Sequence, residues 1–364
     1  MGGELKLCFK TIRRLGFAFL SVFLAGCQFA PSMVSSSSVQ RELVFLNWEN
    51  DVPAAVLDQF EQEQGVKVVY RTYDALEEAV QIIRSGERVD VANLDVRYIS
   101  ALKEAGWLLP LRQDRLPNYK YISPDFRFLT FDPENHYSIP YNWGIIGLLA
   151  RTDLLSRPAT RWSDLWDETL SPQVALYRGD TRELVGIALK SLGYSVNTED
   201  PAELEQAFQH LAELKRRAVF VEDLGLTTPL DLVLEGETPL AMAFAYDWVE
   251  AGEQTPDVSM VIPEEGTMLW YESFVIPQSC AERDAAELFL NFLMRPDIAA
   301  EIANFNHYAT PNMEAWKDIS PEIRQNPLIF PDNAILEQAE MILPLSPQGE
   351  KRYLELWHRY MDIP

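Results

Sequence analysis

Aromatic and acidic side chains stand side by side at several places where a strand-like run of the sequence ends. The sets are Trp48 with Glu49 and Asp51, Asp180 with Glu183, Asp247 with Trp248, Trp270 with Glu272, and Tyr308 within NHYATPN. An alkylammonium ion offers N–H donors and a methylene chain, so carboxylates and aromatic faces together suit it. Each set alone is more often structural than functional, but together they predict a cavity that holds a cation.

A regular alternation of strand-like and helical segments must position these residues. ELVFLNW, VKVVYRTY and VDVANLD are strand-like, whereas PAAVLDQFEQEQG and ALEEAVQIIRSG carry apolar residues at helical spacing. This β-α-β-α order predicts an α/β fold with a parallel sheet joined by right-handed crossovers. Because the carboxyl ends of such strands line the ligand crevice, Trp48, Asp95 and Asp180 are expected to point into it.

The chain beyond its N-terminal segment is long enough for two lobes, each a sheet flanked by helices. HYSIPYNWGIIGLLA is predicted to be a long strand that leaves the first lobe, and the chain is predicted to return near Ser273. We therefore expect lobe 1 to comprise residues 42–147 and 273–321, and lobe 2 residues 148–272 and 322–364. Gly65 is expected to end a helix in the left-handed conformation, and Pro296 to separate two helices.

At the N-terminus, basic residues precede a short apolar run that ends in Leu24-Ala25-Gly26-Cys27. The run is too short to span a bilayer, and its ending resembles the cleavage and acylation site of bacterial lipoproteins. We expect residues 1–26 to be a signal peptide and residues 27–41 a flexible tether. Lipid on Cys27 would anchor the exported protein at the membrane, facing the periplasm or cell exterior. An ordinary signal peptide with a chance cysteine is the alternative.

Composition and motif searches exclude several classes of function. The formal net charge of −24 repels phosphate backbones, so nucleic acid is not an expected partner. The sequence has no G-x-S-x-G, G-x-x-x-x-G-K-[ST] or G-x-G-x-x-G pattern, and its four histidines lack metal-ligand spacing. We therefore expect no catalytic residues, no bound metal and no cofactor. An enzyme on the same scaffold is the rival class, because fold does not dictate function.

Seven segments resemble, in order and spacing, the spermidine/putrescine-binding proteins of bacterial ABC transporters. They are LNWENDVPAAVLDQFEQEQGVKVVYRTY, YSIPYNWG, WSDLWDE, GDTRELVGIALKSLGYSVNTEDPAELEQAF, EGTMLWYESFVIP, FLNFLMRPDIAAEIA and YATPN. The resemblance implies a two-lobed periplasmic-binding-protein-like fold of type II, with a linear polyamine held between the lobes. It also implies capture by hinged lobe closure and delivery to a membrane permease, and we expect a monomer.

The resemblance further implies which residues contact the ligand. They are Trp48, Asp180, Glu183, Phe244, Asp247, Trp270, Glu272 and Tyr308. Phe244 stands where the family has Trp, and Glu272 stands where the family normally has Asp.

Two positions depart from the family pattern. Asn50 stands where the family has an acid, and we expect it to contact the ligand through its carbonyl, which accepts hydrogen bonds from an ammonium group but brings no charge. Glu49 and Asp51 beside it are further candidates for ligand contact. Arg97 stands near a cleft aromatic of the family, and it would repel a polyamine unless Asp95 pairs with it. A ligand that carries a carboxylate beside its amine, an amino-acid-like cation or zwitterion, is therefore left open, with Arg97 as its partner. A polyamine sensor is left open as well.

Overall fold

Ten strands form one continuous mixed sheet in the computed structural model, which describes residues 41–178, 181–221, 227–251 and 255–363. The strands are β1 (Arg41–Asn47), β2 (Val66–Thr72), β3 (Val91–Asp95), β4 (Ser138–Arg151), β5 (Val174–Tyr177), β6 (Ala218–Val221), β7 (Leu240–Phe244), β8 (Val258–Val261), β9 (Met268–Val275) and β10 (Glu340–Met341). Their order is β2-β1-β3-β9-β4-β7-β5-β6, with β10 paired to β9 and β8 paired to β4. The predicted signal peptide, tether and Cys27 lie outside the described residues.

Two parallel units stand at the ends of this sheet. β1 pairs in parallel with β2 and β3, and β5 pairs in parallel with β6 and β7. All five residues of β3 and all four of β5 are buried, as expected for parallel strands covered on both faces. The predicted α/β fold with parallel β-α-β units is confirmed.

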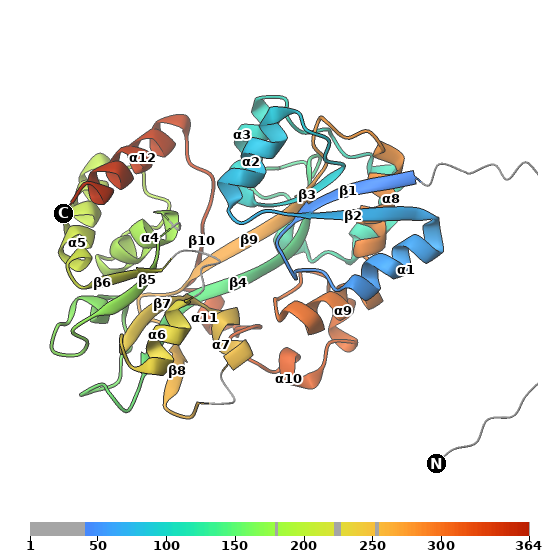
Figure 1. The fold of residues 1–364 in the computed structure, drawn as a ribbon. Coiled ribbons are helices and arrows are strands. Elements are labelled where there is room, and N and C mark those ends of the chain that lie inside the picture. Colours follow the sequence, from blue (N-terminus) through green and yellow to red (C-terminus); the bar gives the residue numbers. More distant parts are fainter. Residues whose placement is uncertain (1–40, 179–180, 222–226, 252–254, 364) are drawn as a thin grey trace, which may run out of the picture. The chain divides into compact units, whose positions relative to one another are not determined.

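Strands β4 and β9 join the two units (Figure 1). They pair antiparallel from Ser138 opposite Val275 to Ile146 opposite Met268, and β9 also pairs antiparallel with β3. β4 has 14 residues, of which only the last is not buried. We expected each lobe to have a sheet of its own. The structure joins them instead, because these two long apolar strands pair along residues 138–146 and 268–275, with one irregularity between Pro140 and Asn142.

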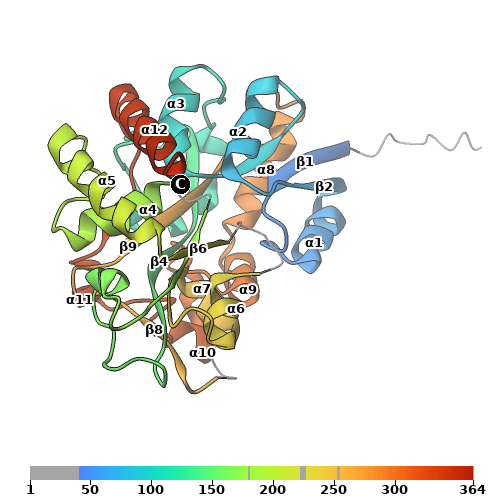
Figure 2. The same cartoon turned by 60° about the vertical axis from the view of Figure 1, so that its left-hand side comes forward.

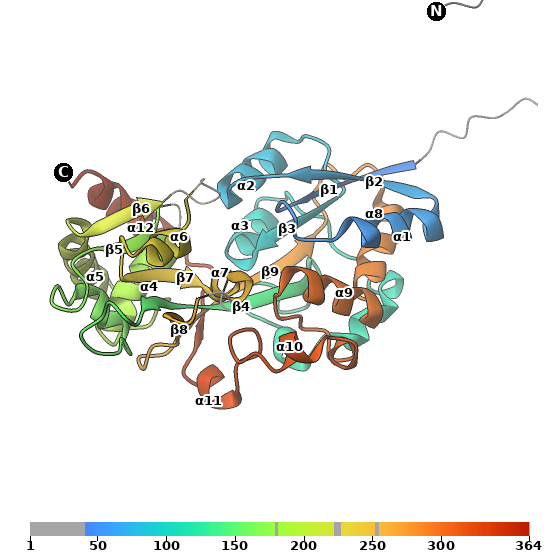
Figure 3. The ribbon, with the colours of Figure 1, turned by 60° about the horizontal axis from the view of Figure 1, so that its bottom comes forward.

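Helices cover the faces of the sheet. They are α1 (Ala54–Gln64), α2 (Leu76–Ser85), α3 (Ile99–Glu104), α4 (Thr181–Ser191), α5 (Pro201–Lys215), α6 (Pro229–Glu235), α7 (Ala245–Ala251), α8 (Arg283–Leu293), α9 (Pro296–Asn306), α10 (Pro321–Arg324), α11 (Asn333–Leu336) and α12 (Pro347–Met361). Short 3-10 helices lie between them, among them η1 (Val96–Tyr98) and η5 (Trp162–Trp166). Figure 3 shows α4, α5 and α12 beside β5 and β6, and Figures 2 and 3 both show α1 and α8 near β1 and β2.

Two predicted helix boundaries are confirmed. Gly65 ends α1 in the left-handed conformation with φ of 65°, and its N–H donates to the carbonyl of Glu61. Glycine adopts this conformation without the steric cost that a Cβ brings. Pro296 begins α9 directly after the end of α8, at the first helical position, where its missing N–H costs nothing.

The buried side chains form separate cores toward the two ends of the sheet. Residues 43–143 and 271–329 build the cores of what we call the first half, and residues 146–270 and 342–360 build those of the second half. The chain thus passes between the halves in β4 and again in β9. None of the helices in the described ranges has the length and apolar character to cross a membrane.

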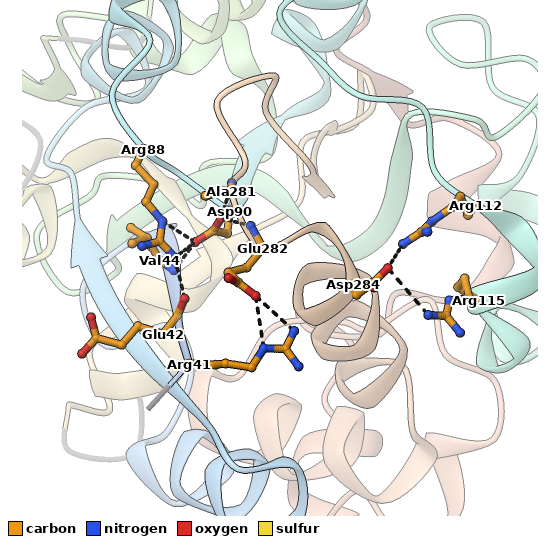
Figure 4. A network of polar contacts seen from close by, with 10 residues as sticks. All are labelled: Arg41, Glu42, Val44, Arg88, Asp90, Arg112, Arg115, Ala281, Glu282 and Asp284. Atoms are coloured by element: carbon orange, nitrogen blue, oxygen red, sulfur yellow. Dashed lines mark hydrogen bonds and ion pairs between the residues drawn. The ribbon is translucent and has the colours of Figure 1, made fainter. Parts of the chain in front are cut away.

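Asp90, immediately before β3, ties the first strand to the start of α8 (Figure 4). Its buried carboxylate accepts hydrogen bonds from the backbone N–H groups of Val44, Ala281 and Glu282, at 2.8, 2.8 and 3.0 Å. Arg88 also pairs with this carboxylate, at 3.0 Å. Asp90 and Ala281 are 191 positions apart in the sequence, so this carboxylate fixes distant segments of the first half to each other.

Candidate functional site

A cavity of about 180 Å³ lies where strands β1, β3, β7 and β9 bring their side chains together. Residues of both halves line it: Trp48, Glu49, Leu76, Asp95, Arg97, Glu183, Phe244, Tyr246, Trp270, Glu272 and Tyr308. Trp48 directly follows β1, Asp95 is the last residue of β3 and Phe244 is the last of β7. The carboxyl ends of parallel strands therefore open into the cavity, as the β-α-β pattern predicted.

Glu272 is a buried acid that lines the cavity. It lies on β9 between Asp95 of β3 and Asn142 of β4, which are its partners in the two neighbouring strands. Its Oε1 accepts a hydrogen bond from the indole Nε1 of Trp48 at 2.5 Å, and its Oε2 accepts one from Nδ2 of Asn93 at 2.7 Å. Both donors are neutral. Among the described residues no Lys or Arg pairs with Glu272, although its side chain is buried.

Burial raises the pKa of Glu272, and the nearby charge of Asp51 raises this pKa further, whereas the bonds from Asn93 and Trp48 lower it. Removing a carboxylate from water disfavours its charged form unless a cation compensates for the lost solvation. A cation that enters the cavity would supply this compensation. The electrostatics of Glu272 thus favour a positively charged guest.

Aromatic rings that pack with the second half line the same cavity as Glu272. Tyr308 meets Trp270 and Tyr246 edge to face, each with ring centroids 5.1 Å apart. Phe244 stacks on Tyr246 at 5.5 Å. Such faces attract an ammonium group and cover a methylene chain.

Gly144 allows the ring of Trp270 to lie against β4. The two residues are partners in the β4–β9 ladder, and a Cβ on Gly144 would stand 2.6 Å from Cζ2 of the Trp270 indole. No real Cβ tolerates such an approach to a buried ring, so the position requires glycine if Trp270 is to keep its place.

Arg97 brings a positive charge into the same cavity. Its Nη1 lies 3.1 Å from Oε1 of Glu183, and its Nε lies 3.2 Å from Oδ1 of Asp95. The backbone N–H of Arg97 also donates to Oδ1 of Asp95 at 2.7 Å. Burial raises the pKa of Asp95, and the guanidinium of Arg97 opposes that rise. Arg97 and Asp95 belong to the first half and Glu183 to the second, so this cluster links the halves directly.

Most of the residues predicted for ligand contact line the cavity. They are Trp48, Glu49, Asp95, Arg97, Glu183, Phe244, Trp270, Glu272 and Tyr308. Asp180 and Cys27 lie outside the described residues.

Three predicted residues do not line the cavity. Asn50 is exposed in a turn and adopts a left-handed φ of 57°. Asp51 points the other way, into the interior, where it accepts hydrogen bonds from Asn47 and Tyr141 at 2.7 and 2.8 Å. Asp247 accepts a hydrogen bond from the backbone N–H of Phe244 at 3.0 Å. These residues hold the turn after β1 and the end of β7 rather than facing the cavity.

Sequence reasoning missed Tyr246, Leu76 and Asn93. Tyr246 follows Phe244 by two residues in AFAYDW, and this second ring was a readable signal. Asn93 precedes Asp95 by two residues on β3, the spacing that places both side chains on one face of a strand. Leu76, the first residue of α2, carried no signal that distinguishes it from a core leucine.

Residues 55–331 match the family model described as bacterial extracellular solute-binding protein. The chain belongs to this family. A solute-binding protein of this kind acts in the periplasm or outside the cell and is not an enzyme, as the sequence predicted.

Named relatives agree with this assignment. The solute-binding protein is 33% identical to the spermidine/putrescine-binding periplasmic protein of Escherichia coli K12, over 82% of this chain and 85% of the relative. A structure solved as a spermidine/putrescine ABC transporter from Listeria monocytogenes matches with a TM-score of 0.81 and 32% identity, over 89% of this chain and 100% of that one. The spermidine/putrescine ABC transporter substrate-binding protein of Streptococcus pneumoniae matches with a TM-score of 0.77 and 27% identity, over 88% and 98%. The predicted periplasmic-binding-protein fold and family are confirmed.

Proposed function

We propose that this protein captures a polyamine, spermidine or putrescine, and delivers it to the membrane permease of an ABC importer. The observation that carries the proposal is Glu272, a buried carboxylate that is held by two neutral donors and lines the same cavity as the rings of Trp270 and Tyr308. A primary ammonium group at Glu272 would replace the missing counter-charge, and its methylene chain would lie against the rings. The printed names of the relatives support the same ligand class.

We infer that the ligand is captured between the halves, because the residues that line the cavity come from both of them. Glu272 and Asp95 pack with the first half and Glu183 and Phe244 with the second, so a ligand that contacts all four holds the halves together. A state in which every contact is made binds the ligand more tightly, and binding shifts the population toward that state. The crossing strands β4 and β9 are the natural hinge. The lobes proposed for this movement are residues 42–147 with 273–321, and residues 148–272 with 322–364. Glu272 and the core residues Ile323 and Ile329 lie across these sequence boundaries, because they pack with the first half.

Delivery would be helped by an anchor at the N-terminus. We propose that residues 1–26 are removed and that lipid on Cys27 keeps the protein at the membrane, as a monomer tethered by residues 27–41. The tether would hold the liganded protein close to its permease. A sensor would capture the same ligand but would not pass it to a permease. Deletion of the permease would therefore abolish polyamine uptake through this protein if it serves a transporter, and would leave its role unchanged if it is a sensor.

A ligand with a carboxylate beside its amine is the second candidate, and Arg97 is the observation that bears on it. The guanidinium of Arg97 already forms ion pairs with two carboxylates of the protein, those of Asp95 and Glu183. Two carboxylates beside this cation disfavour a third from the ligand.

A thermal-shift panel of purified protein tests the proposal. Putrescine, spermidine, spermine and agmatine are compared with lysine, ornithine and glutamate, because a ligand that binds the native state alone raises its melting temperature. We expect at least one of the amines without a carboxylate to stabilise the protein and the amino acids to have no effect. Stabilisation by the amino acids alone would overturn the proposed ligand class.

A further inference from the structure

Arg97 is the unusual residue of a cavity built for a cation. Its side chain is only 10% exposed, so water screens its charge weakly. A buried positive charge in this position competes with a positively charged ligand for the same acids. The contacts of Arg97 therefore bear on how much positive charge the cavity accepts.

The buried charges of the described lining residues determine this amount. Asp95, Glu183 and Glu272 are buried acids, with exposed fractions of 5%, 2% and 6%. Against these three negative charges stands the one positive charge of Arg97. Glu49 also lines the cavity, but it is exposed and solvent screens it. Once Glu272 is ionised, the buried part of the described lining thus carries two uncompensated negative charges.

The protein holds Arg97 in this position from several sides. The carboxylate of Asp95 accepts a hydrogen bond from the backbone N–H of Arg97 at 2.7 Å and forms an ion pair with its guanidinium, with Nε and Oδ1 3.2 Å apart. Glu183 pairs with Nη1 of the same guanidinium. The Arg97 guanidinium carbon also lies 5.9 Å from the centre of the Tyr98 ring. Outside the cavity Arg97 borders a groove between α3 and the start of α12, into which the side chain could turn only by giving up both acids.

We propose that Arg97 is a specificity-determining residue that limits the ligand to two positive charges, so that the cavity selects a short diamine over a triamine or tetraamine. The inference rests on the proposed function, capture of a polyamine. One ammonium group of the diamine meets Glu272 and the other meets the acid pair of Asp95 and Glu183, which keeps one net negative charge beside Arg97. A third ammonium group would enter the cavity without an uncompensated acid, next to a guanidinium that repels it. Buried charges without a partner are strongly disfavoured.

Calorimetric titration of purified full-length protein with putrescine, spermidine and spermine tests this inference. The wild-type protein is compared with Arg97→Gln, which removes the charge, and with Arg97→Lys, which keeps it. We expect the wild type to bind putrescine at least about tenfold more tightly than spermidine or spermine, a ratio that corresponds to 1.4 kcal/mol. Arg97→Gln should shift the ratio of the spermidine and putrescine dissociation constants about tenfold toward spermidine, and Arg97→Lys should shift it less.

The outcomes separate this inference from the proposed function. Wild-type protein that prefers spermidine or spermine would overturn the inference, and so would a ratio that Arg97→Gln leaves unchanged. In both cases the protein still binds polyamines, and the proposed function stands. If no amine binds to the wild type, the proposed function itself fails and the inference fails with it. Because the wild-type preference is measured independently of any variant, a poorly folded Arg97→Gln does not prevent the test.

Discussion

The indole N–H of Trp48 donates a 2.5 Å hydrogen bond to the carboxylate of Glu272, a residue 224 positions later in the chain. The bond joins the end of β1 to β9 across the strand β3, and the Trp48 ring packs on Tyr73 with centroids 4.4 Å apart. It fixes one oxygen of the candidate ligand-binding acid, while Asn93 fixes the other. The acid is thus oriented before any ligand arrives, which lowers the cost of binding.

Removal of this donor should weaken binding. Trp48→Phe keeps a ring in the wall but deprives Glu272 of a hydrogen bond, and a bond to a charged group contributes about 1.5–3 kcal/mol. We expect the dissociation constant for the bound polyamine to rise by at least about tenfold in calorimetry. Trp316→Phe, at an exposed site, is the matched control and should leave affinity unchanged. Equal affinities of the two variants would show that the bond does not orient the acid.

Binding should depend on pH through Glu272. Burial raises the pKa of this carboxyl in the free protein, and a bound cation would lower it again, so binding releases a proton. We expect affinity to increase as pH rises above the ordinary carboxyl value of 4.5 through the raised pKa. Over the same window the free protein loses the stability that the protonated carboxyl contributes, because the unfolded chain ionises first. Titrations between about pH 5 and about pH 9 should show both trends.

Glu272→Gln is the control for this pH dependence, because the amide does not titrate. The variant should bind weakly and with a flatter pH profile. A wild-type affinity that is constant across the window, or that falls as pH rises, would contradict the role given to Glu272.

Gly144→Ala should damage the aromatic wall. The added Cβ would lie 2.6 Å from the Trp270 indole, and overpacking of this kind costs about 1–3 kcal/mol of stability. Gly147→Ala is a matched control on the same strand, because its Cβ would meet the backbone oxygen of Val261, which does not line the cavity. We expect both variants to melt at lower temperature, and only Gly144→Ala to lose polyamine affinity. If the two variants lose affinity equally, the ring of Trp270 has no specific part in binding.

Asp90→Asn should lower stability without changing the ligand preference. Its carboxylate accepts bonds from three backbone N–H groups and pairs with Arg88, away from the cavity (Figure 4). Loss of the charge in this buried network should reduce the free energy of unfolding by about 2–4 kcal/mol, measured by urea denaturation. Asp284→Asn, at an exposed acid nearby, should lower the free energy of unfolding much less, because solvent screens its charge. A smaller loss for Asp90→Asn than for Asp284→Asn would show that Asp90 does not hold β1 to α8.

The types of side chain in the cavity were predictable, because strand ends in a β-α-β pattern converge on one edge of a sheet. Trp48 and Asp95 follow β1 and β3 in this way. The pairing of the two parallel units into one sheet was not predictable from local patterns. It depends on the register of β4 with β9, which joins residues more than a hundred positions apart.

The orientation of three consecutive polar residues could not be predicted from the sequence either. Glu49, Asn50 and Asp51 all offered oxygens, and only Glu49 lines the cavity. Asn50 adopts a left-handed conformation, and the residues on either side of it have different environments. The side chain of Asp51 is buried because it accepts hydrogen bonds from Asn47 and Tyr141 in the interior. Such partners, distant in sequence, decide which of several adjacent acids meets a ligand.

The most direct test of the account is calorimetric titration of the wild-type protein, Glu272→Gln and Glu355→Gln with the polyamine that stabilises the wild type most. Glu355, exposed on α12, provides the same chemical change away from the cavity. We predict that Glu272→Gln binds at least about tenfold more weakly than the wild type, because the ammonium group loses its charged partner. Glu355→Gln should bind as the wild type does. Equal affinities of all three proteins would contradict the assignment of Glu272 as the central ligand-binding acid.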